Sequence, residues 1–357
     1  MEKRIIAIHL PQFYPFKENN EWWGEGFTEW RNVACAKPRF WGHYQPHIPA
    51  DLGFYDLRMH EARIAQQQLA KAYSIHGFCY YHYWFNGHLI MEKPLEAMLN
   101  DKTEDLPFML CWANENWHRN WAGKSNAVLM EQHYSKEDDV AHFKYLLPFF
   151  KDKRYIRIDG KPVFALYKTQ LIPDVEEMIR TFQEEAQKEG FELYICKFEA
   201  NGCRGKKFMK KGIDAAIDFQ PINNDGYRVP YLYFIRLVNI LSPFYKFGLK
   251  YSYGDYVKFQ CKHFGKQNYK TFPCVTPCWD NSPRRVKQLY VCYHNSTPSL
   301  FEKWFSYVFS HFTPFSKDEN LIFINAWNEW AEGCHLEPDL KYKRGFLEAV
   351  KKVVSHG

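Results

Sequence analysis

Eight apolar runs of strand length recur along the 357-residue chain, and they alternate with segments whose apolar residues have helical spacing. Runs without polar interruption are typical of parallel strands buried on both faces. We therefore predict an α/β fold, a (β/α)8 TIM barrel, because eight strand–helix units close most economically in that way. An open doubly wound sheet is the alternative, but no glycine-rich phosphate loop follows the first run. The predicted strands cover residues 4–10, 77–84, 108–113, 163–167, 193–198, 215–219, 272–277 and 321–326.

The segments between these runs predict helices over residues 56–73, 94–100, 136–150, 173–188, 299–312 and 342–354. Two segments break the regular spacing: a long loop rich in Trp, Tyr and Pro at 11–55, and an aromatic-rich insertion at 221–270. No low-complexity linker divides the sequence. We therefore predict one catalytic domain over residues 1–357, with the insertion contained in it.

Residues 231–253 of the insertion are apolar and aromatic but are interrupted by Arg236, Pro243, Lys246 and Lys250. This pattern is too broken for a membrane-spanning helix, which needs about 20 apolar residues in succession. A lid packed over the barrel and an interfacial element at a membrane surface are both consistent with it. We predict a lid, and peripheral membrane contact through 231–253 is the alternative.

Aromatic residues make up 18% of the sequence, with 12 Trp, 24 Tyr and 30 Phe. Part of this content fills a core, but sugar-binding clefts also use aromatic faces, because the C–H faces of a pyranose pack against them. The net charge of +6 is modest for this length and does not indicate a nucleic-acid partner. We predict an oligosaccharide or polysaccharide substrate, no nucleic acid and no cofactor.

The ten cysteines form no framework of close pairs, and Cys79, Cys111 and Cys196 sit inside apolar runs. Reduced, buried thiols of this kind are typical of cytoplasmic proteins. The first residues lead into a strand without the apolar stretch of a signal peptide. We expect a cytoplasmic location. A basic run at 204–211 reads as a solvated loop or as a contact for phosphate or anionic lipid, so association with a membrane stays open.

The densest chemical signal follows the eighth run, where Glu329 and Glu332 stand three residues apart. A helical turn would project both carboxylates into one cleft. Glycosidic cleavage needs such a pair, in which one group protonates the leaving oxygen and the other acts as base or nucleophile. The alternative interpretation is the acidic first turn of an ordinary helix, which the helix dipole favours.

Polar and aromatic residues also follow four other predicted strands, where a barrel places its catalytic groups. They include Glu25 and Glu29 after the first, His82 after the second, Glu115 after the third and Asp280 after the seventh. His82 is equally consistent with a buried core histidine.

The sequence offers little support for a metal site. His43 and His47 have the i,i+4 spacing of a helical metal pair, but Pro46 argues against a helix, and Cys274 and Cys278 have no partners at metal-binding spacing. We expect no metal.

These motifs resemble those of a known group. The segments HLPQFYP, NEWWGEGFTEW, FCYYHYWFNG, CWANENW and NAWNEWAEGCHLEP are similar to WbsX-type proteins, which resemble glycoside hydrolase family 99 and are found with bacterial surface-polysaccharide genes. The resemblance covers nearly the whole chain and also implies a (β/α)8 barrel. The more distant family 99 endo-α-mannosidases and mannanases have a similar Asn-Glu-Trp-x-Glu-Gly segment.

Carried over by position, the resemblance makes Glu329 the base that assists attack by the sugar's own 2-hydroxyl and Glu332 the general acid/base. It implies net retention through a 1,2-anhydro sugar. The predicted substrate-binding residues are Tyr14, Trp23, Glu25, Glu29, His82, Trp84, Asn114, Glu115, Trp117, Trp279, Asp280, Asn328 and Trp330.

Three functions are consistent with these patterns. The first is a retaining glycosidase or transglycosylase that acts on α-linked, mannose-like sugars of a bacterial surface polysaccharide. The second is a glycosyltransferase in O-antigen or capsule biosynthesis, although the sequence contains no glycine-rich nucleotide loop. The third is a non-catalytic glycan-binding barrel, which would have little use for both glutamates.

Overall fold

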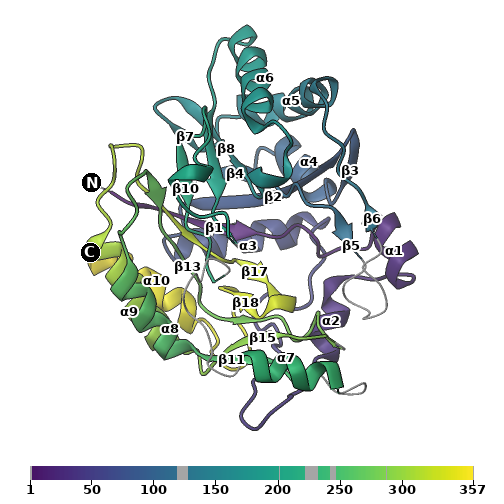
Figure 1. Ribbon diagram of the computed structural model, residues 1–357, viewed down its shortest axis with the longest axis vertical. Coiled ribbons are helices and arrows are strands. Elements are labelled where there is room, and N and C mark those ends of the chain that lie inside the picture. The colour runs from purple at the N-terminus through teal and green to yellow at the C-terminus, as the bar shows by residue number, and fades with distance from the viewer. Residues whose placement is uncertain are drawn as a thin grey trace.

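The computed structural model describes residues 2–118, 128–200, 202–221, 232–241, 247–286 and 288–356. Within them, parallel strands form the ring of a (β/α)8 barrel with helices around its outside (Figure 1). The predicted fold and all eight predicted strand positions are confirmed. The barrel strands are β1 (Arg4–His9), β2 (Gly77–Phe85), β4 (Phe108–Trp112), β8 (Lys161–Leu166), β9 (Tyr194–Phe198), β10 (Ala215–Ile217), β12 (Thr271–Phe272) with β13 (Cys274–Val275), and β16 (Leu321–Ile324).

The ring closes through a strand that is divided at Pro273 into β12 and β13. β12 pairs with β10 and β13 pairs with β16, so the two halves join the sixth strand to the eighth. β16 also pairs with β1, with Leu321 opposite Arg4. The sequence predicts one continuous strand at 272–277. The structure divides it because proline lacks the N–H that a ladder needs.

Helices cover the outside of the ring. Six predicted helices are present with ends within four residues of the prediction, whereas α8 lies inside the aromatic-rich insertion and was not predicted. Asp56 accepts a hydrogen bond from the backbone N–H of Arg58 at 2.9 Å, and this turn delays the start of α3. The helices of the ring are α3 (His60–Ala72), α4 (Lys93–Asn100), α5 (Lys136–Lys151), α6 (Val175–Lys188), α8 (Tyr253–His263), α9 (Pro298–His311) and α10 (Gly345–His356).

Smaller elements decorate the barrel. The long loop after β1 contains two short helices, α1 (Lys17–Trp23) and α2 (Glu29–Cys35). The short strands are β3 (His88–Ile90), β5 (Trp117–His118), β6 (Val128–Met130), β7 (Arg157–Ile158), β11 (Leu249–Ser252), β14 (Trp279–Asp280), β15 (Val291–His294), β17 (Asn328–Glu329) and β18 (Cys334–His335). The 3-10 helices are η1 (Thr169–Leu171), η2 (Lys206–Phe208) and η3 (Trp330–Glu332).

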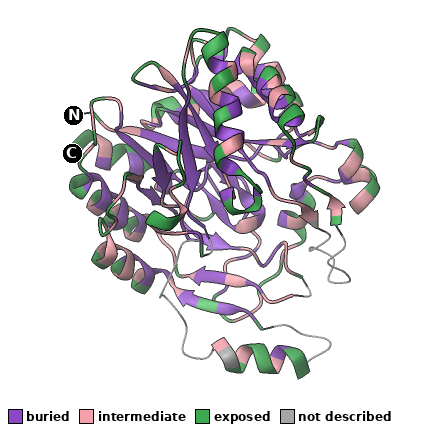
Figure 2. Cartoon of the chain, turned by 45° about the horizontal axis from the view of Figure 1, so that its top comes forward, coloured by how far each residue is buried: buried purple, intermediate pink, exposed green. Residues whose placement is uncertain are grey.

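The ring strands are buried on both faces, and Figure 2 shows them as the buried centre of the molecule. Every residue of β4, β9 and β16 is buried. All ten cysteines are free thiols, and Cys79, Cys111 and Cys196 lie in this core. The burial predicted for these three residues is confirmed.

The described part of the insertion contains α7 (Leu232–Leu241), β11 and α8. α7 lies at the periphery and is largely exposed (Figure 2). Its Leu232 and Ile235 pack against the core, whereas its other face is open to solvent. Residues 222–231 and 242–246, which belong to the predicted lid, lie outside the described residues. None of the helices among the described residues has the length and apolar character that crossing a membrane requires.

Candidate active site

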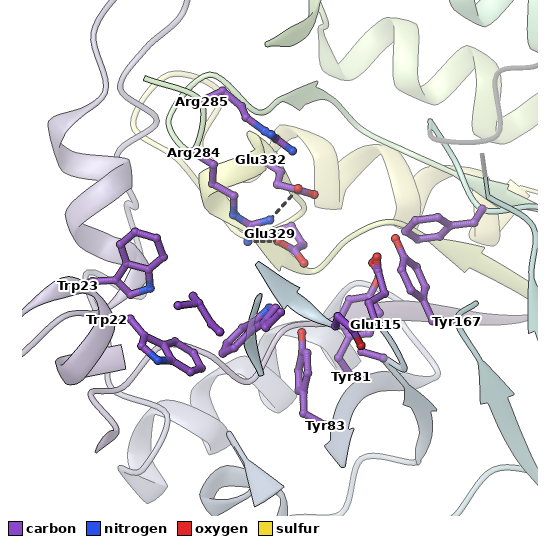
Figure 3. A pocket seen from close by; sticks show the side chains of 15 residues that line it. Trp22, Trp23, Tyr81, Tyr83, Glu115, Tyr167, Arg284, Arg285, Glu329 and Glu332 are labelled. Atoms are coloured by element: carbon purple, nitrogen blue, oxygen red, sulfur yellow. Dashed lines mark hydrogen bonds and ion pairs between the residues drawn. The ribbon is translucent and has the colours of Figure 1, made fainter. Parts of the chain in front are cut away.

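A cavity of about 290 Å³ opens at the carboxyl ends of the barrel strands. Figure 3 shows Arg284, Glu329 and Glu332 together on one side of it, with Tyr81 and Tyr83 across from them and Trp22 and Trp23 at another side. Catalytic groups of (β/α)8 barrels lie at this face. The described residues that line the cavity are Trp22, Trp23, Tyr81, Tyr83, Ala113, Glu115, Asn116, Trp117, Leu129, Tyr167, Phe219, Arg284, Arg285, Glu329 and Glu332.

The two glutamates reach this cavity from one tight turn. Asn328 pairs with His335 across the antiparallel strands β17 and β18, and η3 connects the strands. A single 3-10 turn places side chains three residues apart on the same side, so both carboxylates face the cavity. Glu329 is the more deeply buried, with 8% of its side chain exposed, against 21% for Glu332. The turn is therefore not the acidic start of an α-helix.

Gly333 ends this turn in the left-handed region, at φ +54°. A Cβ added there would lie 3.0 Å from the Cβ of Asp280 and 3.1 Å from its carbonyl oxygen. We expect Gly333→Ala to lower the free energy of unfolding by about 1–3 kcal/mol. Gly53→Ala is the matched control, because Gly53 has a similar φ of +60° and no heavy atom within 4 Å of the added Cβ. Equal losses in urea unfolding would contradict the crowding against Asp280.

Arg284 is the electrostatic centre of the site. Its Nη2 donates to Glu329 Oε2 at 2.9 Å, and its Nη1 lies 2.7 Å from Glu332 Oε1. Its Nε donates to the two carboxylate oxygens of Glu29 at 3.1 and 3.0 Å. Glu29 is fully buried at the start of α2. One guanidinium thus holds three carboxylates, and it ties the loop after β1 to the turn after β16.

Burial dominates the titration of the pair. It raises the pKa of Glu329 to about 8, an effect that the Arg284 charge opposes and that the charges of Glu332 and Glu29 reinforce. Burial also raises the pKa of Glu332, again against Arg284. Both groups therefore hold protons more strongly than ordinary carboxyl groups do. Raised carboxyl pKa values in a cleft are typical of acid–base catalysts.

Two asparagines, each directly before a glutamate of the site, fasten neighbouring strands together. Asn328 accepts from the backbone N–H of Leu10 at 2.8 Å and donates to its carbonyl at 3.0 Å. Asn114 does the same with Lys168, at 2.8 and 2.9 Å. Neither asparagine lines the cavity. Both are predicted substrate contacts, and in the structure their amides fix the chain from which Glu329 and Glu115 project.

Three other predicted contact residues reach the cavity: Trp23 from α1, Glu115 after β4, and Trp117 at the start of β5. Glu115 also forms an ion pair with Lys168. Glu29 contacts the site through Arg284 rather than by lining the cavity. The loop after β1 and the chain after β4 therefore supply walls to the pocket, as the motifs predicted.

His82 and Trp84 point away from the cavity, toward α5. The Nε2 atoms of His82 and His142 are 2.8 Å apart, and the indole N–H of Trp84 donates to Asp138. The structure therefore supports the core interpretation of His82. Tyr14 packs with Phe16 and Phe85 in a small separate cluster, and Glu25 is exposed, where it accepts a hydrogen bond from Asn20.

Three more predicted contact residues lie behind the turn that carries Glu329 and Glu332. Trp279 and Asp280 line a second cavity, and the Asp280 carboxylate accepts hydrogen bonds from His43 and Gln45. Trp330 stacks on His335 at 3.8 Å between ring centres, and its indole N–H donates to the buried carboxylate of Glu337 at 2.6 Å. These residues support the turn from outside the pocket.

Several residues that line the pocket were not predicted from the sequence. Tyr81 and Tyr83 stand in the same strand motif as His82 and Trp84 but on the opposite face. Arg284 follows the seventh strand inside a motif whose Trp279 and Asp280 were selected instead. Alternation along β2 places Tyr81 and Tyr83 on one face and His82 and Trp84 on the other, but it does not tell which face lines the pocket. The other lining residues not predicted are Trp22, Ala113, Asn116, Leu129, Tyr167, Phe219 and Arg285.

Comparisons with known proteins identify relatives that match nearly the whole chain. The chain matches the family model described as Glycosyltransferase WbsX over residues 5–350. Two proteins named WxcX and described as uncharacterized, from two strains of Xanthomonas campestris pv. campestris, are each 35% identical to it. These alignments cover 98% of this chain but 49% of each relative, so the chain spans about half the length of the curated relatives it matches.

Solved structures agree with the barrel. The family 99 endo-α-mannosidase from Bacteroides thetaiotaomicron, in complex with bis-tris-propane, gives a TM-score of 0.59 at 12% identity and covers 99% of this chain and 97% of that one. A structure described as a glycoside hydrolase-like protein gives 0.60 at 14% identity, with 99% and 94% covered. At these identities the likeness establishes the fold. Because the family model matches nearly the whole of this chain, the chain belongs to the WbsX family.

Proposed function

We propose that the protein is a carbohydrate-active enzyme, namely a retaining glycoside hydrolase or transglycosylase that acts on α-linked, mannose-like sugars of a surface polysaccharide. The observation that carries the proposal is the pair Glu329 and Glu332, which face one aromatic-walled cavity from a single turn and share Arg284. Paired carboxyl groups are what glycosidic cleavage needs. Tyrosine and tryptophan walls offer flat faces on which sugar rings pack.

In the proposed reaction Glu329 removes the proton of the sugar's 2-hydroxyl, whose oxygen attacks the anomeric carbon. The bond to the leaving oxygen breaks, and Glu332 protonates that oxygen. Water or a second sugar hydroxyl, deprotonated by Glu332, then opens the 1,2-anhydro ring at the anomeric carbon, and Glu329 returns its proton to the 2-oxygen. Two inversions give net retention. The greater exposure of Glu332 suits the group that meets the leaving group and the incoming hydroxyl.

The test is mass spectrometry of an α-glycan library incubated with purified protein, with and without nucleotide sugars. Glycans shortened or rearranged without any added donor are the expected products. Products that grow only with a nucleotide sugar would replace this proposal with a glycosyltransferase. An unchanged library, with or without donors, would count against both activities, and tight glycan binding alongside it would favour a non-catalytic binder.

A glycosyltransferase is the second candidate, and the description of the matching family model favours it. A nucleotide-sugar donor brings a diphosphate, which needs cationic or backbone N–H partners. Among the described residues that line the cavity, the basic groups Arg284 and Arg285 stand against the acids Glu115, Glu329 and Glu332. Arg284 is already engaged by three carboxylates. This balance of charge is less suited to a diphosphate than to a neutral glycan.

The raised pKa of Glu329 predicts the pH dependence of the reaction. The first step needs Glu329 deprotonated and Glu332 protonated, so kcat/KM on the glycan found by the screen should follow a bell-shaped pH profile. Because burial raises both pKa values, this profile should lie at higher pH than that of an ordinary pair of carboxyl groups. On its acid side, below both pKa values, each pH unit is expected to change the rate by about tenfold. Steady-state kinetics between pH 5 and 10 would measure it. A maximum near pH 5 with a decline above it would argue against Glu329 as the base.

We also propose that α7 touches an anionic membrane surface. Phe234, Leu237, Ile240 and Leu241 are exposed on this helix at helical spacing. Residues 231–253 contain three basic residues and no acidic one, which complements anionic lipid. Sedimentation with phosphatidylserine vesicles should recover the protein, and Leu237→Asp combined with Ile240→Asp should reduce the recovery at least tenfold. Equal recovery of wild type and variant, or equal binding to neutral phosphatidylcholine vesicles, would contradict the contact.

A further inference from the structure

A buried group of two histidines and one aspartate lies behind the catalytic turn. His47 comes from the loop after β1, His335 from β18, and Asp339 from the segment that follows. The Nδ1 of His47 is 2.9 Å from the Nε2 of His335, which is 3.9 Å from the Oδ2 of Asp339. His335 is fully buried, and the other two side chains belong to residues that are at most 6% exposed.

The hydrogen bonds around this group leave one carboxylate oxygen of Asp339 facing a lone pair of His335. The Nδ1 of His335 lies 2.9 Å from the carbonyl oxygen of Glu337, which only accepts, so Nδ1 carries the hydrogen and Nε2 presents a lone pair. The Oδ2 of Asp339 is buried and has no hydrogen-bond donor among the described residues. A buried carboxylate oxygen without a donor costs free energy. The Nε2 lone pair of His335 can accept the Nδ1–H of His47 at 2.9 Å, but the Asp339 oxygen, 3.9 Å from that lone pair, is left without a donor.

A neighbouring group provides a contrast. His43, Asp280 and Cys292 also lie close together. The backbone N–H of Arg39 donates to His43 Nδ1, so the Nε2 of His43 carries its hydrogen and donates to Asp280 at 2.6 Å. Hydrogen bonds from Gln45 and from the backbone of Ser282 complete the Asp280 carboxylate. Since these contacts satisfy Asp280, the group needs no ion.

We propose that His47, His335 and Asp339 bind a divalent transition metal ion, with Zn²⁺ as the expected ion. Two imidazole nitrogens and a carboxylate oxygen are ligands that zinc takes in proteins. Tetrahedral zinc places its ligand atoms about 3.3 Å apart, which lies between the two distances observed here. The bond from His335 Nδ1 to a backbone carbonyl is the outer contact that metal-binding histidines usually make. Water from the adjacent cavity of about 160 Å³ would supply the fourth ligand.

The surrounding backbone holds the ligands in place. The N–H of Ala50 donates to Pro338 at 2.8 Å and that of Leu340 donates to Ile48 at 2.9 Å, so the segments that carry His47 and Asp339 are fastened together. This metal would not take part in the reaction, because the described residues that line its cavity do not line the active-site pocket. It would instead fix the back of the turn, where His335 stacks on Trp330 between the two catalytic glutamates. The assignment departs from the expectation of no metal, which considered His47 only together with His43.

The experiment measures metal content and affinity directly, without reference to activity. Purified protein is stripped with a chelator, loaded with Zn²⁺ or Co²⁺, dialysed and analysed by elemental mass spectrometry. We expect about one metal ion per chain, a higher melting temperature with zinc, and the visible absorption of tetrahedral Co²⁺. Asp339→Asn should weaken zinc binding by more than the roughly 10- to 100-fold that loss of an outer contact costs.

Asp101→Asn is the control, because Asp101 belongs to a group with His60 and Glu104 in which the Asp101 and His60 side chains reach the surface, and it represents adventitious surface binding. This variant should load like the wild type. If Asp339→Asn fails to fold, His47→Gln removes a ligand from the other side, and the cobalt spectrum of the wild type needs no variant. Wild-type protein that retains no zinc, or cobalt that shows only an octahedral spectrum, would overturn the proposal.

Discussion

Glu332→Gln is expected to lower kcat/KM on a natural glycan by about a thousandfold or more while the protein stays folded. The amide keeps the shape of the side chain but has no proton to give to the leaving oxygen, and general acid catalysis of this kind is worth about 10²- to 10⁴-fold. The loss should be much smaller on an aryl glycoside with an acidic leaving group, which departs without protonation. Steady-state kinetics on both substrates, with circular dichroism of each variant, would measure this difference.

Glu25→Gln is the matched control for this variant. Glu25 belongs to the same set of predicted site residues, but the structure places it at the surface. Its substitution should leave kcat/KM on both substrates unchanged. Turnover of the natural glycan by Glu332→Gln at the wild-type rate would overturn the assignment of the acid, whereas equal losses on both substrates would indicate a role other than protonation.

Arg284→Met is expected to be the second most damaging change, with a loss of about 100- to 1000-fold in kcat/KM. Without the guanidinium, three carboxylates share a buried site with no positive charge between them, so Glu329 and Glu332 take up protons. Because the base must lose its proton to act, the remaining activity should move to higher pH. Arg284→Lys keeps the charge and should recover part of the rate and of the original pH profile.

The rate and pH profile of Arg284→Met are compared with those of Arg285→Met. Arg285 lines the same cavity, but its guanidinium donates to the side chain of Gln288. A merely structural role for Arg284 would lower the melting temperature without moving the pH profile. A wild-type profile in Arg284→Met would therefore contradict the electrostatic role described for this residue.

The fold could be predicted from sequence because the parallel strands of a barrel are continuous apolar runs, and β4, β9 and β16 are buried at every position. The same property hides which side chains face the pocket. In β2 both faces are buried, one against α5 and the other inside the barrel, so no polar alternation distinguishes Tyr81 and Tyr83 from His82 and Trp84. The choice between the two sets needs the position of α5.

The acid pair could be predicted because both residues lie in one short segment after a strand. Arg284 could not be assigned in this way, because its partners Glu29 and Glu329 lie 255 and 45 residues away in the chain. Contacts at such separation depend on how the barrel closes. The same is true of His47 and His335, which are 288 residues apart.

The position of β16 has a consequence for when the candidate site is completed during synthesis. This strand pairs with β13 on one side and with β1 on the other, and Glu329 and Glu332 follow it directly. While a ribosome has produced the chain only as far as residue 320, β1 and β13 each have an edge without the partner that they later gain. Such a nascent chain holds Arg284 and Glu29 but neither Glu329 nor Glu332, so the final ring closure and the completion of the carboxylate pair coincide. Under the proposed function, a growing chain would gain activity toward sugars only after its last barrel strand has emerged.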